Sequence, residues 1–177
     1  MKSISPIVNS GDIFLTTDPE EGISKAIVWA EKKLSKDHQA NYSHVAIVDV
    51  NEQLLDTLWT VRYSPLTAYK GKPYRIYRPL VEETYLINAL AEARKSLGVR
   101  YPWQRLLLYF VGLADNIHWD RRVCSENVAK TLHEAFKQVR VFDFEKYHGM
   151  SPDNIDDICA NSPFFSLIDE GKALMHG

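Results

Sequence analysis

The chain has 177 residues, of which 45% are hydrophobic and 25% are charged. This length and composition are typical of a globular protein, and we expect a single domain spanning residues 1–177. The 21 Lys and Arg and the 23 Asp and Glu give a formal net charge of −2, so the strongly basic surface of a nucleic-acid-binding protein is excluded.

Neither a secretion signal nor a membrane span is expected. The first six residues lack the apolar region of a signal peptide. The longest apolar run, residues 106–111, is too short to cross a bilayer. The only two cysteines, Cys124 and Cys159, are too few for a disulfide framework. We therefore expect a cytoplasmic protein with reduced thiols.

Short β-prone runs dominate the first half of the chain. Residues 13–15 form a buried strand after a turn, and a capping residue followed by proline predicts a helix from residue 18 to residue 34. Residues 43–50 and 54–61 predict a β-hairpin whose first strand is covered on both faces. A single helical turn is expected at residues 64–69.

Helices become more frequent in the following stretch. Before them, the alternation of side-chain types along residues 74–79 predicts a third strand. Apolar residues at helical spacing predict an amphipathic helix over residues 86–97, which Gly98 closes as a left-handed cap. A mostly buried helix is expected at residues 104–113.

The last third contains two helix starts. A helix begins at or beside Cys124, since Val128 and Leu132 continue its apolar face. Residues 139–142 form a candidate strand, and a serine followed by proline at residues 151–154 begins another helix. The apolar end of the chain must also pack against the fold.

Cys124 is the candidate nucleophile because of its position at a helix start. Unpaired backbone N–H groups and the positive end of the helix dipole favour a thiolate there. Cys159 lies among apolar residues of the last predicted helix, where a small core residue is the better interpretation.

His44 is the candidate base. It is the one polar ring in an apolar strand, and such a ring has a chemical use if it faces a cleft. Taken alone, a histidine in this setting is more often a core residue bonded to a backbone carbonyl.

Asp56, on the next strand, is the candidate that orients His44. An odd number of loop residues would place Asp56 opposite Ala46 and on the same face as His44. A two-residue turn would place it on the other face, where it would be a carboxylate in water. Thr57 is the fallback, and Asp49 should point away from His44.

Two groups are candidates for the oxyanion site: the backbone N–H of Cys124 and the side chain of Tyr101. Tyr101 has an equally good structural interpretation as an aromatic residue packed under a loop. Glu126 would oppose a thiolate if it faced Cys124, so we expect it to point toward Arg121 or Arg122.

Other chemistries lack their sequence patterns. There is no glycine-rich phosphate loop and no Gly-x-Ser-x-Gly motif. No histidine or cysteine pair has the spacing of a metal site. We therefore expect no cofactor and no metal.

Six short segments occur in an order that resembles a known family. They are GDIFL (11–15), SHVAIV (43–48), LLDT (54–57), LGVRYP (97–102), VCSENV (123–128) and SPDNI (151–155). The set resembles the circularly permuted papain-like cysteine hydrolases of the NlpC-like superfamily, specifically the YiiX-like branch. Lecithin retinol acyltransferase is a more distant relative of this group.

The resemblance implies a fold and a set of roles. The fold would be α+β, a permuted papain-like domain with an antiparallel sheet and the nucleophile helix packed against it. Cys124 would be the nucleophile, His44 the base and Asp56 the third polar residue, where the branch often has a glutamate. Tyr101 matches a tyrosine near the active site of the family.

The sequence thus predicts a cysteine hydrolase, an amidase or peptidase, that works through a thioester on an amide or ester carbonyl. Cell-wall peptides and small amides are the expected substrates. Two alternatives stay open: a lipid or amine acyltransferase with the same triad, and a non-catalytic binding module on the same fold. The sequence does not indicate an oligomeric state.

Overall fold

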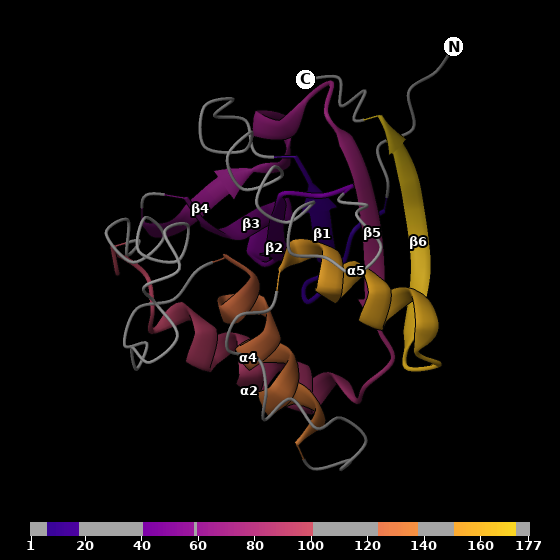
Figure 1. Cartoon of the computed structure of the whole chain (residues 1–177). Helices are drawn as coiled ribbons and strands as arrows, with labels where there is room; N and C mark the ends of the chain where they lie inside the picture. Colours follow the sequence, from indigo (N-terminus) through magenta and orange to yellow (C-terminus); the bar gives the residue numbers. More distant parts are fainter. Residues whose placement is uncertain (1–6, 18–40, 59, 101–123, 138–150, 173–177) are drawn as a thin grey trace, which may run out of the picture.

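Six strands form one antiparallel sheet in the order β4-β3-β2-β1-β5-β6 in the computed structural model (Figure 1). The structure describes residues 7–17, 41–58, 60–100, 124–137 and 151–172. The strands are β1 (Ile13–Thr16), β2 (His44–Val48), β3 (Gln53–Thr57), β4 (Val61–Pro65), β5 (Pro73–Pro79) and β6 (Phe165–Lys172).

Strand β1 lies in the middle of the sheet because its residues are apolar on both faces. It pairs with β2 on one side, where Phe14 opposes Ala46, and with β5 on the other, where Phe14 opposes Ile76. Every residue of β1 is buried. A strand of this composition is stable only where both of its faces are covered.

Three described helices pack against one face of the sheet: α2 (Glu83–Arg94), α4 (Cys124–Phe136) and α5 (Pro152–Asn161) (Figure 1). Helix α4 contacts both α2 and α5 as well as β2 and β3. The core between helices and sheet contains Leu15, Ile47, Leu90, Leu132 and Ile155, among other residues. The predicted α+β class, with the Cys124 helix packed on an antiparallel sheet, is confirmed.

The opposite face of the sheet carries a second apolar cluster. Phe14, Ala46, Leu54 and Ile76 lie there, together with residues of a short 3₁₀ helix, η2 (Leu66–Tyr69). The predicted single turn at residues 64–69 corresponds to η2. This helix is important for the site because it brings Tyr69 against β2 and β3.

The predicted second strand of the hairpin, residues 54–61, was wrong in its extent. Strand β3 ends at Thr57, and Val61 begins β4, which pairs back on β3. Thr57 and Val61 are cross-strand partners. Leu58 and Val61, on either side of the reversal, are apolar and buried, so the sequence resembles one continuous strand.

The predicted helix over residues 86–97 also ends earlier than expected. Helix α2 stops at Arg94, and the next residues continue as tighter turns, as in the bond from the Leu97 N–H to the Arg94 carbonyl. Gly98 does have a left-handed backbone, with φ of 82°. The glycine therefore ends the turn that follows α2 rather than α2 itself.

The helix start predicted at residues 151–154 is confirmed. Ser151 caps α5, with Pro152 in the first turn and a reciprocal bond between Ser151 and Asn154. The apolar end of the chain becomes the edge strand β6, which pairs with β5.

Three predicted elements lie outside the described residues: the helices at 18–34 and 104–113 and the strand at 139–142. Within the described part of the chain, no helix is long and apolar enough to cross a membrane.

Candidate functional site

The register of the β2–β3 hairpin places Asp56 on the same face of the sheet as His44. Ile47 opposes Leu55 and Val48 opposes Leu54, so Asp56 falls opposite Ala46. The Asp49 N–H donates to the Gln53 carbonyl at 2.6 Å, and the three residues of the 3₁₀ turn η1 (Val50–Glu52) lie between this pair. The turn contains two residues with positive φ, 55° and 58°, which fits the odd loop that the assignment required.

His44 and Asp56 form a buried hydrogen-bonded pair. The Nε2 atom of His44 lies 2.7 Å from Oδ1 of Asp56. Their side chains are 2% and 0% exposed. The hydroxyl of Tyr69 donates to the other oxygen, Oδ2, at 2.7 Å, and Ser64 contributes a further side-chain hydrogen bond to the carboxylate. The carboxylate is therefore fully bound in a site shielded from water.

The surroundings favour the charged forms of both residues. Burial opposes ionisation of His44, but the charge of Asp56 and the hydrogen bond to it raise the pKa of His44 well above its ordinary value. Burial also opposes ionisation of Asp56, but the His44 charge and the bonds from His44 and Tyr69 hold the pKa of Asp56 below its ordinary value. The two directions agree with an imidazolium–carboxylate pair.

Cys124 is the first residue of α4 and approaches His44 from that helix. Its side chain lies close enough to His44 to act on the ring, and its hydrogen bonding and charge also raise the pKa of the imidazole. The residue is 6% exposed. Cys124 begins the described part of α4, and the backbone N–H groups of a helix's first turn are suited to holding an anion.

The start of α4 is attached to β3 by a buried polar contact. The side-chain amide of Asn127 donates to the Thr57 hydroxyl at 3.4 Å. Asn127 lies one turn after Cys124, and Thr57 directly follows Asp56. This contact ties the element that carries the thiol to the strand that carries the acid.

Asp56 is bound to one of the two ring nitrogens of His44, Nε2. Because Asp56 occupies Nε2, the other nitrogen, Nδ1, is the atom that can exchange a proton with the thiol. The site thus contains a nucleophile, a base and a group that orients the base, which is the minimal set for nucleophilic catalysis.

The structure brings three of the four sequence-predicted site residues together: Cys124, His44 and Asp56. Tyr101 lies outside the described residues, as do Arg121 and Arg122, the expected partners of Glu126.

The two other oxygen-bearing candidates near the base have different partners. Thr57 accepts a bond from Asn127, as above. Asp49 binds Arg94 of α2 and the hydroxyl of Tyr63, in agreement with the expectation that it points away from His44.

Sequence reasoning did not identify Tyr69 or Ser64 as partners of Asp56. Tyr69 follows Asp56 by 13 residues on a turn whose position depends on how η2 packs against the sheet. The spacing of apolar residues along the chain does not indicate how η2 packs against the sheet. The cross-strand pair of Ser64 and Leu54 could have been found only after the strand break near Thr57 was known.

Cys159 has a different environment from Cys124. It is buried in the core between the helices and the sheet, and burial, with the nearby charge of Asp156, raises the pKa of its thiol. A thiol held protonated in this way is a poor nucleophile, which agrees with the interpretation of Cys159 as a core residue.

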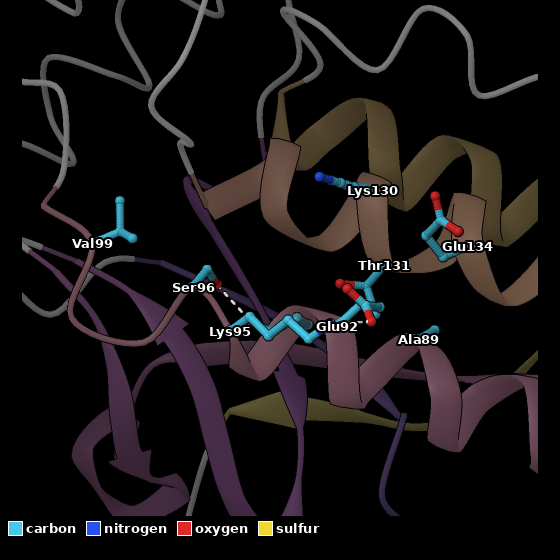
Figure 2. A pocket seen from close by; sticks show the side chains of 9 residues that line it. Ala89, Glu92, Lys95, Ser96, Val99, Lys130, Thr131 and Glu134 are labelled. Carbon is cyan, nitrogen blue, oxygen red and sulfur yellow. Dashed lines mark hydrogen bonds and ion pairs between the residues drawn. The ribbon is translucent and has the colours of Figure 1, made fainter.

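A separate cavity of about 430 Å³ lies between α2 and α4 (Figure 2). Its described lining residues are Ala89, Glu92, Ala93, Lys95, Ser96, Val99, Lys130, Thr131 and Glu134. None of the residues of the Cys124–His44–Asp56 cluster is among them. Charges of both signs surround it, and the cavity does not contribute to the chemistry described here.

No group of three His, Cys, Asp or Glu side chains arranged to hold a metal occurs among the described residues.

Comparisons of the chain with protein-family models, with curated proteins and with solved structures found no match.

Proposed function

We propose that the protein is a cysteine hydrolase, an amidase or peptidase, that acts on an amide or ester carbonyl through a thioester. The observation that carries the proposal is the buried His44–Asp56 pair, with the Cys124 side chain, at the start of α4, near enough to His44 to raise the pKa of its ring. A structural histidine needs one partner to be satisfied. Here the ring links a carboxylate to a thiol, as general-base activation of a nucleophile requires.

The reaction proceeds in two proton-balanced halves. In the resting imidazolium–thiolate pair His44 already holds the thiol proton, and Sγ of Cys124 attacks the carbonyl carbon while backbone N–H groups at the start of α4 hold the oxyanion. The intermediate collapses to a thioester as the imidazolium protonates the departing amine or alcohol. The neutral His44 then takes a proton from the water that attacks the thioester. Collapse of this second intermediate breaks the C–S bond, releasing the acid and restoring the Cys124 thiolate beside the His44 imidazolium.

The same residues support assignment to the permuted papain-like, NlpC-like group. In this chain the histidine strand precedes the cysteine helix, which is the order expected for the permuted form. The six-stranded antiparallel sheet with α4 packed on it is compatible with that fold. We propose small amides or cell-wall peptides as the substrate class.

The experiment that tests the proposal is alkylation of Cys124 by iodoacetamide as a function of pH. An ordinary thiol titrates at about 8.5, whereas an imidazolium-paired thiolate keeps reacting at about pH 6. We expect Cys124 to react at the lower pH, and His44→Ala to abolish that component. Cys159→Ala is the matched control and should leave the profile unchanged.

A thiol-directed acyl probe distinguishes the alternatives. Labelling that disappears in Cys124→Ala and falls sharply in His44→Ala supports the hydrolase, and release of the acyl group by added amine rather than by water would indicate an acyltransferase. Labelling equally strong in wild type and both variants would overturn the proposal in favour of a binding module.

A further inference from the structure

Tyr69 makes two separate contacts with the His44–Asp56 pair. Its hydroxyl donates to Oδ2 of Asp56 at 2.7 Å. Its ring stacks on the imidazole of His44, with centroids 5.6 Å apart and planes inclined by 14°. Tyr69 is the last residue of η2 and is 0% exposed.

The hydroxyl restricts the rotation of the carboxylate. Oδ1 of Asp56 is bound by His44 and Oδ2 by Tyr69, so a rotation of the group would break two hydrogen bonds to a charged acceptor. Bonds of this kind are stronger than neutral ones. The carboxylate is therefore held in the orientation that faces Nε2.

The aromatic ring acts on the imidazole itself. A tyrosine face carries negative charge density, which stabilises a cation lying over it. The near-parallel ring also covers one face of His44 and excludes water from it. Tyr69 is fixed in turn by the core, since its ring packs on Phe14 of β1 with centroids 5.5 Å apart.

We propose that Tyr69 is a positioning residue of this site, which aligns the Asp56 carboxylate and covers the His44 ring so that the imidazolium–thiolate pair forms. This inference rests on the proposed function, because it assigns Tyr69 a role in activating Cys124. Tyr69 acts through the other residues of the cluster and does not itself exchange a proton with the thiol.

The test compares the Cys124 alkylation rate at about pH 6 with the rate at about pH 9.5, where any accessible thiol is ionised. The ratio of the two rates reports pairing with His44 and cancels changes in accessibility. We expect Tyr69→Phe to lower the ratio on the order of tenfold, the effect of losing one hydrogen bond to a charged group. Tyr69→Leu, which also removes the ring, should lower it further.

Tyr63→Phe is the matched control. The Tyr63 hydroxyl donates to the buried Asp49 at 2.8 Å, so its removal also takes away a tyrosine–aspartate bond, but one outside the site. Its alkylation ratio should equal that of the wild type. A purely structural role for Tyr69 would change both rates in parallel and leave the ratio as in wild type, and that result in Tyr69→Phe overturns the inference.

Titration of His44 followed by NMR separates this inference from the proposed function. If wild type and His44→Ala alkylate identically at the lower pH, the proposed function fails, and the His44 titration then decides the role of Tyr69. A His44 titration at lower pH in Tyr69→Phe than in wild type supports positioning, because a carboxylate that has lost one of its hydrogen bonds is held less firmly against the imidazolium. An unchanged titration overturns it.

Discussion

At the scale of single residues, the charge state of His44 depends on what surrounds its ring. The ring is almost completely buried, which alone would favour the neutral form. The Asp56 carboxylate reverses that preference, and the bond to Cys124 adds to the reversal. Each partner is supplied by a different element, so the base depends on the assembled fold.

The effect of Asp56 on His44 can be measured directly. Asp56→Asn keeps the shape of the side chain but removes its charge, so the pKa of His44 should fall. The titration of the His44 ring protons by NMR checks this. Asp49→Asn is the control, since it removes a buried carboxylate that binds Arg94 and not His44. It should leave the pKa of His44 unchanged. Equal titrations in wild type and Asp56→Asn would contradict the assigned pairing.

At the scale of elements, the turn before β1 is closely packed against α2. Gly11 has φ of 94°, and a Cβ atom built there would lie 2.2 Å from a methyl carbon of Leu86. The Gly11 N–H also donates to the Val48 carbonyl at 2.7 Å. Glycine is needed here for its backbone conformation and for the close approach of the helix.

Two glycine substitutions separate these requirements. Gly71 has φ of 80° with open space around it, so Gly71→Ala should cost about 1–2 kcal/mol from the backbone alone. Gly11→Ala has the same backbone cost and also displaces Leu86, which should add about 1–3 kcal/mol. Urea denaturation of both variants measures the difference. Equal losses would show that Leu86 moves aside without cost.

At the scale of the whole molecule, the buried pair makes stability depend on pH. The pKa of His44 is raised in the folded state, so the folded protein binds this proton more tightly than the unfolded chain, whose histidines titrate at about 6.5. The stabilisation is complete below that unfolded value and is lost as pH rises through the folded pKa of His44. Asp56 acts in the opposite sense and loses its contribution only in acid.

The prediction is a urea midpoint that falls as pH rises above about 6.5. His44→Gln removes the titrating ring and should flatten this part of the curve. Comparison of urea midpoints for the two proteins across this pH range provides the measurement. A wild-type midpoint that rises over the same range would contradict the raised pKa.

The sequence by itself determined the features that depend on neighbouring residues. The cap at Ser151 and the apolar face that follows Cys124 lie within single helices, and each was located correctly because capping and helical periodicity act over a few residues. The antiparallel sheet was implied by the resemblance to the permuted papain-like hydrolases, and the β-prone runs added only the hairpin. The sequence could not decide whether Asp56 lies on the same face of the sheet as His44, since adding or removing one loop residue moves Asp56 to the other face.

Only the tertiary structure decided which partners complete the site. The turn with positive φ angles between β2 and β3 has an odd number of residues, which places Asp56 on the face of His44. The reversal after Thr57 made β3 shorter than the predicted strand. The fold of η2 then brought Tyr69 onto both His44 and Asp56. These contacts join residues from separate elements, and their free energy comes from burial in the assembled core. No local pattern in the chain encodes such a contact, whereas the thiol at the start of α4 was visible from the sequence.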